Sequence, residues 1–85
     1  MEDVKTHKLI LHNDKKNTFL YVMACLIRFC DHLPMQAEQC ALLAHEMGRC
    51  TVKSGDLLEM LELSESLRNL DLKTSVEEYE SNMHR

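Results

Sequence analysis

The sequence predicts a single α/β (α+β) domain, in which a three-stranded, mainly antiparallel sheet carries three helices packed on one face. Three observations lead to this fold class. The chain has 85 residues, enough for one small domain. Hydrophobic residues make up 45% and charged residues 28% of it, which is typical of a folded globular protein. The spacing of its apolar residues gives the order strand, helix, helix, strand, helix, strand.

The N-terminal part of the chain is expected to form a strand and then a helix. Residues 8–12 are short and apolar-centred, and a polar loop at 13–17 follows them. Asn17 or Thr18 is placed to cap the helix, which should stop near residues 31–32. The side chains expected to face the core recur at helical spacing and are Phe19, Val22, Met23, Leu26 and Cys30.

A second helix is predicted between Pro34 and Gly48. Proline suits the first helical turn, where its missing N–H costs nothing, and glycine adopts the left-handed conformation that terminates a helix. The face expected to be buried carries unusually small side chains, apart from its last member, and consists of Ala37, Cys40, Ala41, Ala44 and Met47.

The C-terminal part of the chain is expected to form a strand, a helix and a last strand. Residues 50–53 have strand character, 54–56 supply a turn and a helix cap, and the helix covers about 56–70. Residues 72–76 alternate apolar and polar and predict the last strand. In the helix, Leu57, Met60, Leu61 and Leu67 should point inward, and Glu59, Glu62 and Glu65 should face solvent.

These elements divide the chain into three parts. A short N-terminal extension covers residues 1–7, the folded domain covers 8–77, and a charged C-terminal tail covers 78–85.

Composition and charge exclude several classes of protein. The net charge is -4 and Lys and Arg are not clustered, so nucleic-acid binding is not expected. The longest apolar run, residues 19–27, is far shorter than the roughly 20 residues of a membrane span. The acidic start lacks the features of a secretory signal, so we expect a cytoplasmic protein whose cysteines stay reduced.

Two polar groups of residues are candidates for a binding site. His45 lies one helical turn after Ala41 and next to Ala44, so a hydrogen-bonding ring stands beside two side chains too small to fill space. Such small residues also let two helices pack closely, with His45 at the core edge. Asn13 and Asp14 lie where the first strand gives way to the loop, and they either form a turn or join His45 in a site.

Four collinear stretches of sequence carry a resemblance to a known family. They are residues 9–14 (LILHND), 17–19 (NTF), 36–45 (QAEQCALLAH) and 48–55 (GRCTVKSG). Through them the chain resembles ClpS, the adaptor of Clp proteases, and is most similar to its short-loop bacterial members. The resemblance extends from about residue 8 to residue 77.

The resemblance implies a non-catalytic adaptor without a cofactor. Such an adaptor binds substrate proteins by a destabilising N-terminal residue (an N-degron), usually a bulky aromatic or Leu, and delivers them to a Clp-type AAA+ unfoldase. The positions that hold the substrate's α-amino group correspond to Asn13, Lys15 and His45, with Asp14 in the same loop. The pocket for the first side chain corresponds to Asn17, Phe19, Val22, Ala41, Ala44 and Leu72.

Lys15 departs from the family pattern. The usual loop reads Asn-Asp-Asp, whereas this chain reads Asn13-Asp14-Lys15, so an expected carboxylate is replaced by a cation. We therefore expect weakened recognition of a free amine, or a ligand with a neutral or negatively charged start. Lys15 could also swing into solvent on its flexible stem, which lowers the repulsion without restoring the carboxylate.

Three other classes of protein compete with the adaptor. A structural zinc site is disfavoured because no Cys-x-x-Cys pair occurs, and Cys25 and Cys30 lie about 140° apart around an ideal helix. A Cys-His enzyme is disfavoured because nothing marks one cysteine as activated. A ClpS-like regulator that docks the unfoldase without presenting substrate stays open because of Lys15.

Overall fold

The structure is a computed structural model and describes residues 5–79. Its elements in chain order are β1 (His7–His12), α1 (Phe19–Cys30), α2 (Pro34–Met47), β2 (Arg49–Gly55), α3 (Leu57–Arg68) and β3 (Thr74–Glu78). The predicted α+β class and the order strand, helix, helix, strand, helix, strand are confirmed.

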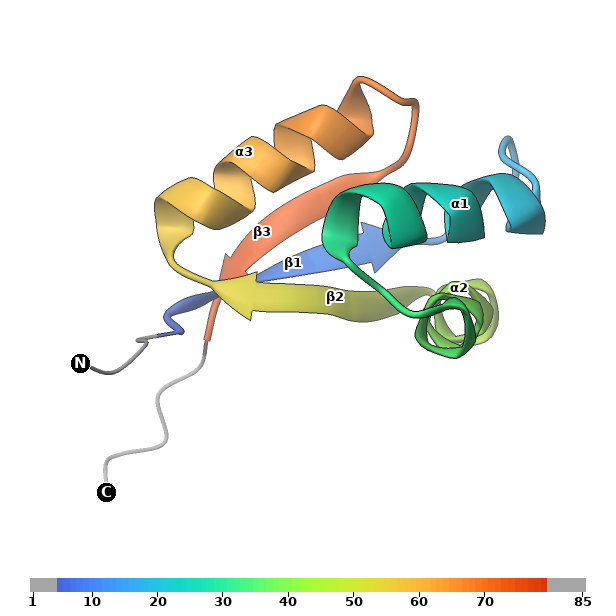
Figure 1. Cartoon of the computed structure of the whole chain (residues 1–85). Coiled ribbons are helices and arrows are strands. Elements are labelled where there is room, and N and C mark those ends of the chain that lie inside the picture. Colours follow the sequence, from blue (N-terminus) through green and yellow to red (C-terminus); the bar gives the residue numbers. More distant parts are fainter. Residues whose placement is uncertain (1–4, 80–85) are drawn as a thin grey trace.

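The three strands form one antiparallel sheet with β1 in the middle, in the order β2-β1-β3 (Figure 1). Leu9 pairs with Lys53 and Ile10 pairs with Thr51, so Val52 is an extra residue that makes a β-bulge in β2. Because β1 is hydrogen-bonded on both edges, it is the best-covered strand. Its residues Leu9, Ile10 and Leu11 are at most 2% exposed.

The helices begin and end at the residues that local side-chain chemistry predicts. The Thr18 hydroxyl accepts a hydrogen bond from the Tyr21 N–H at 3.1 Å, and the Asp56 carboxylate accepts one from the Glu59 N–H at 2.8 Å. Gly48 ends α2 with φ of 94°, a left-handed value that glycine adopts without strain.

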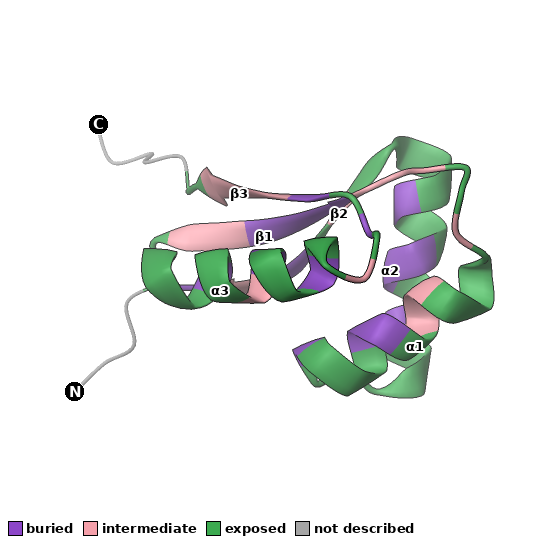
Figure 2. Cartoon of the chain, turned by 90° about the horizontal axis from the view of Figure 1, so that it is seen from above, coloured by how far each residue is buried: buried purple, intermediate pink, exposed green. Residues whose placement is uncertain are grey.

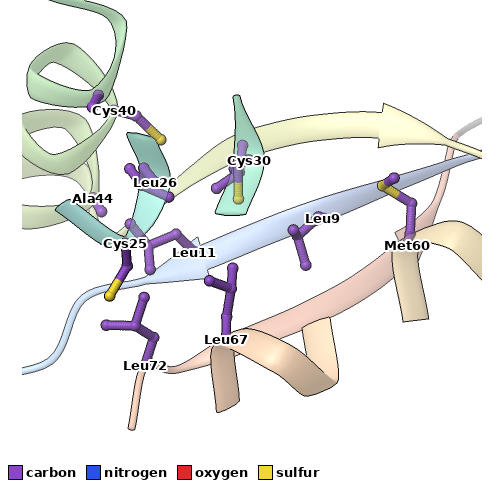
Figure 3. Packing of buried hydrophobic residues seen from close by; sticks show 12 residues of the cluster. Leu9, Leu11, Cys25, Leu26, Cys30, Cys40, Ala44, Met60, Leu67 and Leu72 are labelled. Carbon is purple, nitrogen blue, oxygen red and sulfur yellow. The ribbon is translucent and has the colours of Figure 1, made fainter. Parts of the chain in front are cut away.

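Helices α3 and α1 lie on one side of the sheet, and α2 lies at the end where β2 begins (Figure 1). In Figure 1, α3 runs above β1 and β3, and α1 continues on the same side beyond the end of α3. The second helix packs against both α1 and β2. Figure 2 shows that the buried residues lie on the sides of the elements that face one another. The buried cluster between the helices and the sheet consists of Leu9, Leu11, Cys25, Leu26, Cys30, Ala37, Cys40, Ala44, Val52, Met60, Leu67 and Leu72 (Figure 3).

Four side chains that were expected to point into the core are exposed. Phe19 is 40%, Leu57 45%, Leu61 47% and Met47 72% exposed. In α3 only the narrow row Met60, Ser64 and Leu67 is buried, and Leu57 and Leu61 lie beside this row. Phe19 and Met47 lie in the first turn of α1 and the last turn of α2, at the ends of their buried faces.

The limits of both outer strands differ from the prediction: β2 is longer than predicted, and β3 begins and ends two residues later. The second strand extends to Gly55, so residues 54 and 55 belong to the sheet and do not form a turn. The third begins at Thr74 and continues to Glu78, past the predicted end at residue 76. These limits are set by backbone pairing with β1. The alternation of apolar and polar residues in the sequence does not reveal this pairing.

The proposed terminal segments lie mostly outside the described part of the chain. Residues 1–4 and 80–85 are not described, while His7 and Glu78 pair with each other inside the sheet. None of the helices among residues 5–79 has the length and apolar character that a bilayer crossing requires.

Candidate functional site

A cavity of about 510 Å³ lies where the loop after β1 meets α1 and α2. Its lining residues are Leu11, His12, Asn13, Asp14, Lys15, Asn17, Phe19, Val22, Ala41, Leu42, Ala44 and His45. The structure therefore brings together every site residue selected from the sequence except Leu72. The lining comes from three segments that are distant in the sequence.

Leu72 lies elsewhere. Its side chain is 3% exposed and belongs to the buried cluster (Figure 3). It also borders a second hollow, together with Thr74 and Ser75, and His12 is the residue that lines both hollows. Leu72 thus contributes to the core behind α1 rather than to the cavity lining.

Leu11, His12 and Leu42 line the cavity and were not selected from the sequence. Leu11 lies in the apolar run of β1 and is 2% exposed, as expected for a core residue. Nothing in the sequence around it indicates that it also lines the cavity. The His12 Nε2 atom lies 2.7 Å from the Ser75 hydroxyl oxygen, so this ring nitrogen is used in a hydrogen bond between β1 and β3. Leu42 is 39% exposed, and its position next to Ala41 is the only available signal.

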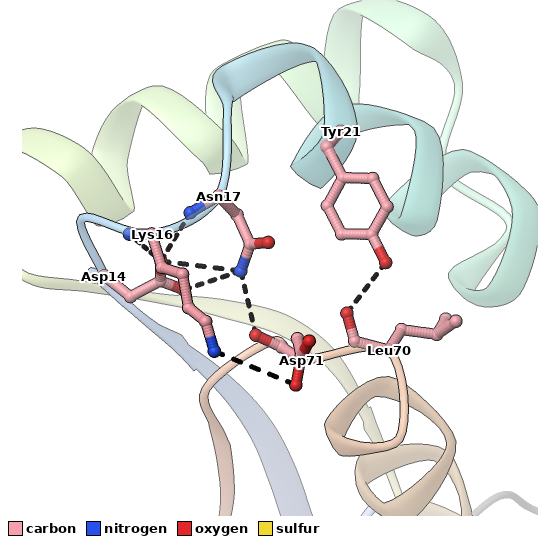
Figure 4. Close-up of polar contacts among 6 residues, drawn as sticks. All are labelled: Asp14, Lys16, Asn17, Tyr21, Leu70 and Asp71. Atoms are coloured by element: carbon pink, nitrogen blue, oxygen red, sulfur yellow. Dashed lines mark hydrogen bonds and ion pairs between the residues drawn. The ribbon is translucent and has the colours of Figure 1, made fainter.

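The loop at residues 13–17 is held by the Asp14 carboxylate. Its Oδ1 accepts the backbone N–H groups of Lys16 at 2.8 Å and Asn17 at 2.9 Å. The Asn17 Nδ2 donates to Asp14 Oδ2 at 3.2 Å and to the Asp71 carbonyl at 2.8 Å (Figure 4). Asp14 and Asn17 therefore fix the shape of the loop, although both also border the cavity.

The hydrogen bonds to Asp14 change its acidity. Burial by itself raises the pKa of this carboxyl group, but the N–H donors of Asn17 and Lys16 favour the charged form more strongly. The net result is a pKa below the ordinary value of an aspartate.

Two further contacts anchor the loop and α1 to the connection between α3 and β3. Lys16 Nζ lies 3.9 Å from an Asp71 carboxylate oxygen, and both side chains are exposed. The Tyr21 hydroxyl donates to the Leu70 carbonyl at 2.7 Å (Figure 4). No local pattern predicts these contacts, because their partners lie about fifty positions apart in the chain.

Backbone pairing brings Asn13 close to the end of α2. The Asn13 N–H donates to the Gly48 carbonyl at 3.0 Å, and the Gly48 N–H donates to the Ala44 carbonyl at 3.0 Å. His45 stands on this last turn of α2. The loop and the helix end are therefore held against each other by main-chain bonds, which leaves their side chains free for other contacts.

Three polar side chains of the cavity lining have no partner among residues 5–79. No hydrogen bond within residues 5–79 uses the Asn13 amide or the His45 ring, and Lys15 forms no ion pair there. An Asn amide offers an acceptor and two donors, and a neutral imidazole offers one of each. The cavity also contains Ala41 and Ala44, each 4% exposed, whose methyl groups fill little space.

The arrangement suits binding. Part of the lining is apolar, and three polar side chains can meet a ligand: the amide of Asn13, the ammonium of Lys15 and the ring of His45. Among the described residues 5–79, no group of three or more His, Cys, Asp or Glu side chains is placed to hold a metal ion. Fold and cavity together define a small α+β domain with a partly apolar cavity at one end of the sheet.

Comparison with known proteins identifies the family. The model of the family described as ATP-dependent Clp protease adaptor protein ClpS matches residues 2–76, so the chain belongs to the ClpS family. Among solved structures, it is similar to Agrobacterium tumefaciens ClpS2 bound to L-phenylalaninamide, with 17% sequence identity and a TM-score of 0.75. The match covers 88% of this chain and 98% of that one, and at this identity it shows the fold. A search of curated proteins finds no match.

Proposed function

We propose that the chain is an adaptor that binds the N-terminal residue of substrate proteins in the cavity beside Asn13 and His45 and delivers them to a Clp-type AAA+ unfoldase. The observation that carries this proposal is that the Asn13 amide and the His45 ring, which form no hydrogen bond within residues 5–79, line a partly apolar cavity of about 510 Å³. Family membership supports the adaptor role. L-phenylalaninamide, the ligand of the similar ClpS2 structure, combines a free amine with an aromatic side chain.

The chemistry of the cavity mouth fits part of an α-ammonium group. Such a group has three N–H donors to satisfy. The Asn13 carbonyl and a neutral His45 ring nitrogen each accept one hydrogen bond. The third acceptor expected from the family pattern is a carboxylate at position 15, and Lys15 offers none.

The positive charge of Lys15 lowers the affinity for a free amine. Two like charges about 4 Å apart repel by roughly 1 kcal/mol in water and by about 4 kcal/mol at an effective dielectric constant of 20. These energies correspond to a loss of affinity between about fivefold and several-hundred-fold. Lys15 is exposed and flexible, which favours the lower end of this range. A substrate with a neutral or negatively charged start avoids the repulsion.

The apolar side of the cavity accommodates the first side chain of the substrate. Phe19 and Val22 of α1 line it together with Ala41 and Ala44 of α2. The two alanines leave more space than larger residues, which favours bulky side chains. Burial of a Phe or Leu side chain contributes about 1.5 to 3 kcal/mol, enough to offset part of the repulsion by Lys15.

Calorimetric titration tests the proposal. The ligands are peptides that begin with Phe, Leu, Tyr or Trp and are otherwise identical. We expect the unmodified chain to bind them more weakly than micromolar, and Lys15→Asp to bind at least one of them tenfold or more tightly. Lys5→Asp makes the same change of charge at an exposed position before β1, which does not line the cavity. This control should change affinity only a few-fold.

Two results contradict different parts of the proposal. Micromolar or tighter binding by the unmodified chain contradicts the weakened recognition of a free amine. Absence of binding by Lys15→Asp to all four peptides contradicts binding of N-terminal residues in this cavity.

A second candidate function is a regulator that docks a Clp unfoldase without presenting such substrates. The cation that Lys15 places at the cavity mouth favours it. Pull-down with the cognate unfoldase, with and without an N-degron peptide, separates the two functions. A regulator binds the unfoldase equally well in both cases and gains no substrate delivery from Lys15→Asp.

A further inference from the structure

We propose that Cys40 and Cys50 form a reversible disulfide that ties α2 to β2 when the protein meets a peroxide. The two sulfur atoms lie 2.8 Å apart, with the Cys40 thiol donating to the Cys50 sulfur. A disulfide bond is about 2.05 Å long, so less than 1 Å of further approach forms it. The inference is independent of the ligand proposed for the cavity.

The surrounding backbone holds the two cysteines together. Cys40 lies on the buried face of α2, and Cys50 is the second residue of β2, paired across the sheet with Leu11. The chain reverses between them at Gly48, whose amide and carbonyl groups are both hydrogen-bonded. Packing of α2 against β2 therefore holds the two sulfur atoms side by side in the folded protein.

The two cysteines differ in their access to solvent. Cys40 is 4% exposed, whereas Cys50 is only partly buried. Burial raises the pKa of the Cys40 thiol well above its ordinary value, and the Cys50 sulfur beside it raises this pKa further. A peroxide therefore meets Cys50 first, and Cys40 stays a thiol in contact with it.

The chemistry balances in two steps. The Cys50 sulfur attacks the peroxide, whose O–O bond breaks, and this gives a sulfenic acid on Cys50 and an alcohol, or water from hydrogen peroxide. The Cys40 sulfur then attacks the Cys50 sulfur, the S–O bond breaks, and the departing hydroxide takes the Cys40 proton as water. Two thiols are oxidised and one peroxide is reduced. A small thiol reverses the crosslink by exchange.

The crosslink closes a short loop that contains part of the cavity wall. Ala41, Ala44 and His45 all lie between the two cysteines. Closing the loop restricts the unfolded chain and so raises the melting temperature by several degrees. It also slows hydrogen exchange of the Gly48 amide, because α2 and β2 can no longer separate locally.

Peptide mapping of the full chain tests the proposal. The protein is treated with hydrogen peroxide, and its remaining free thiols are blocked by alkylation. It is then cleaved after glutamate and arginine, which places Cys40 and Cys50 in different peptides. We expect these two peptides to be joined, and dithiothreitol to separate them. The oxidised protein should melt several degrees higher than the reduced one. Cys50→Ser should abolish both effects, and Cys30→Ala should retain the crosslink.

Any other product overturns the proposal. Conversion of Cys50 to sulfinic acid without a crosslink shows that Cys40 does not reach it. A dimer joined through Cys50, or a crosslink that contains Cys25 or Cys30, shows that a different thiol reacts faster. A crosslink with no gain in melting temperature overturns its stabilising role.

Discussion

Asp14 and Lys15 are neighbours in the chain, but their side chains have different surroundings. The Asp14 carboxylate accepts two backbone N–H groups of its own loop. Lys15 is exposed at the cavity and makes no ion pair within residues 5–79. The carboxylate of Asp14 therefore holds the loop, and it is poorly placed to act as the acceptor that the family resemblance implies at position 15.

Replacing Asp14 with Asn should reduce stability at neutral pH and have less effect in acid. The folded protein lowers the pKa of Asp14, so the charged form stabilises the fold above about pH 3.9, the usual pKa in unfolded chains. This contribution is lost as the pH falls through the still lower pKa of the folded state. Melting temperatures of the unmodified chain and Asp14→Asn, measured between pH 7 and pH 3, should converge below about pH 4.

An exposed carboxylate provides the control for this pH dependence. Glu62 lies on the solvent side of α3, and its side chain forms no hydrogen bond within residues 5–79. Glu62→Gln should leave the pH profile of the melting temperature unchanged. A constant difference between the unmodified chain and Asp14→Asn at every pH contradicts the role assigned to the Asp14 charge.

At the scale of elements, the limits of the helices and of β1 could be predicted to within a residue or two, whereas those of β2 and β3 could not. Thr18, Pro34 and Gly48 act through the backbone of their own helix, so their residue types are sufficient signals. The ends of β2 and β3 depend on which residues of β1 they pair with. Pairing joins distant segments and leaves no mark on the local pattern.

The candidate site was predicted from a resemblance more than from local chemistry. Small residues beside His45 indicated a hollow, and the polar loop indicated either a turn or a site. Only the similarity to the family joined the two. The exceptions have physical reasons: Leu11 has the pattern of a core residue, and Leu72 is drawn into the core where the chain enters β3.

Gly48→Ala should destabilise the protein through the backbone alone. Gly48 has φ of 94°, and a Cβ atom built there meets no heavy atom within 4 Å, so there is space but an unfavourable conformation. We expect a loss of about 1 to 2 kcal/mol in the free energy of unfolding, measured by urea denaturation.

Gly48→Asn is the matched variant. Asparagine tolerates left-handed conformations better than alanine, so it should cost less. Equal losses for the two variants, or no loss for Gly48→Ala, contradict a conformational role for this glycine.

At the scale of the whole molecule, the core contains its smallest side chains beside the cavity. The buried side chains of α2 are alanines and one cysteine, namely Ala37, Cys40, Ala41 and Ala44. The largest fully buried side chains come from the sheet, α1 and α3 instead, and are Leu9, Ile10, Leu11, Leu26, Met60 and Leu67. Small residues on α2 make room for the cavity, so stability depends on the contacts between α3, α1 and β1.

Leu67→Ala should therefore remove a large part of the stability of the domain. Leu67 is fully buried in the central cluster, and loss of such a side chain costs about 2 to 5 kcal/mol, against a total of roughly 5 to 15 kcal/mol for a typical domain. Leu58→Ala on the same helix is the matched control, because Leu58 is 66% exposed and should cost about 0.5 kcal/mol or less. Urea denaturation of both variants measures the difference. Similar losses for the two leucines mean that α3 is not packed through the row that contains Leu67.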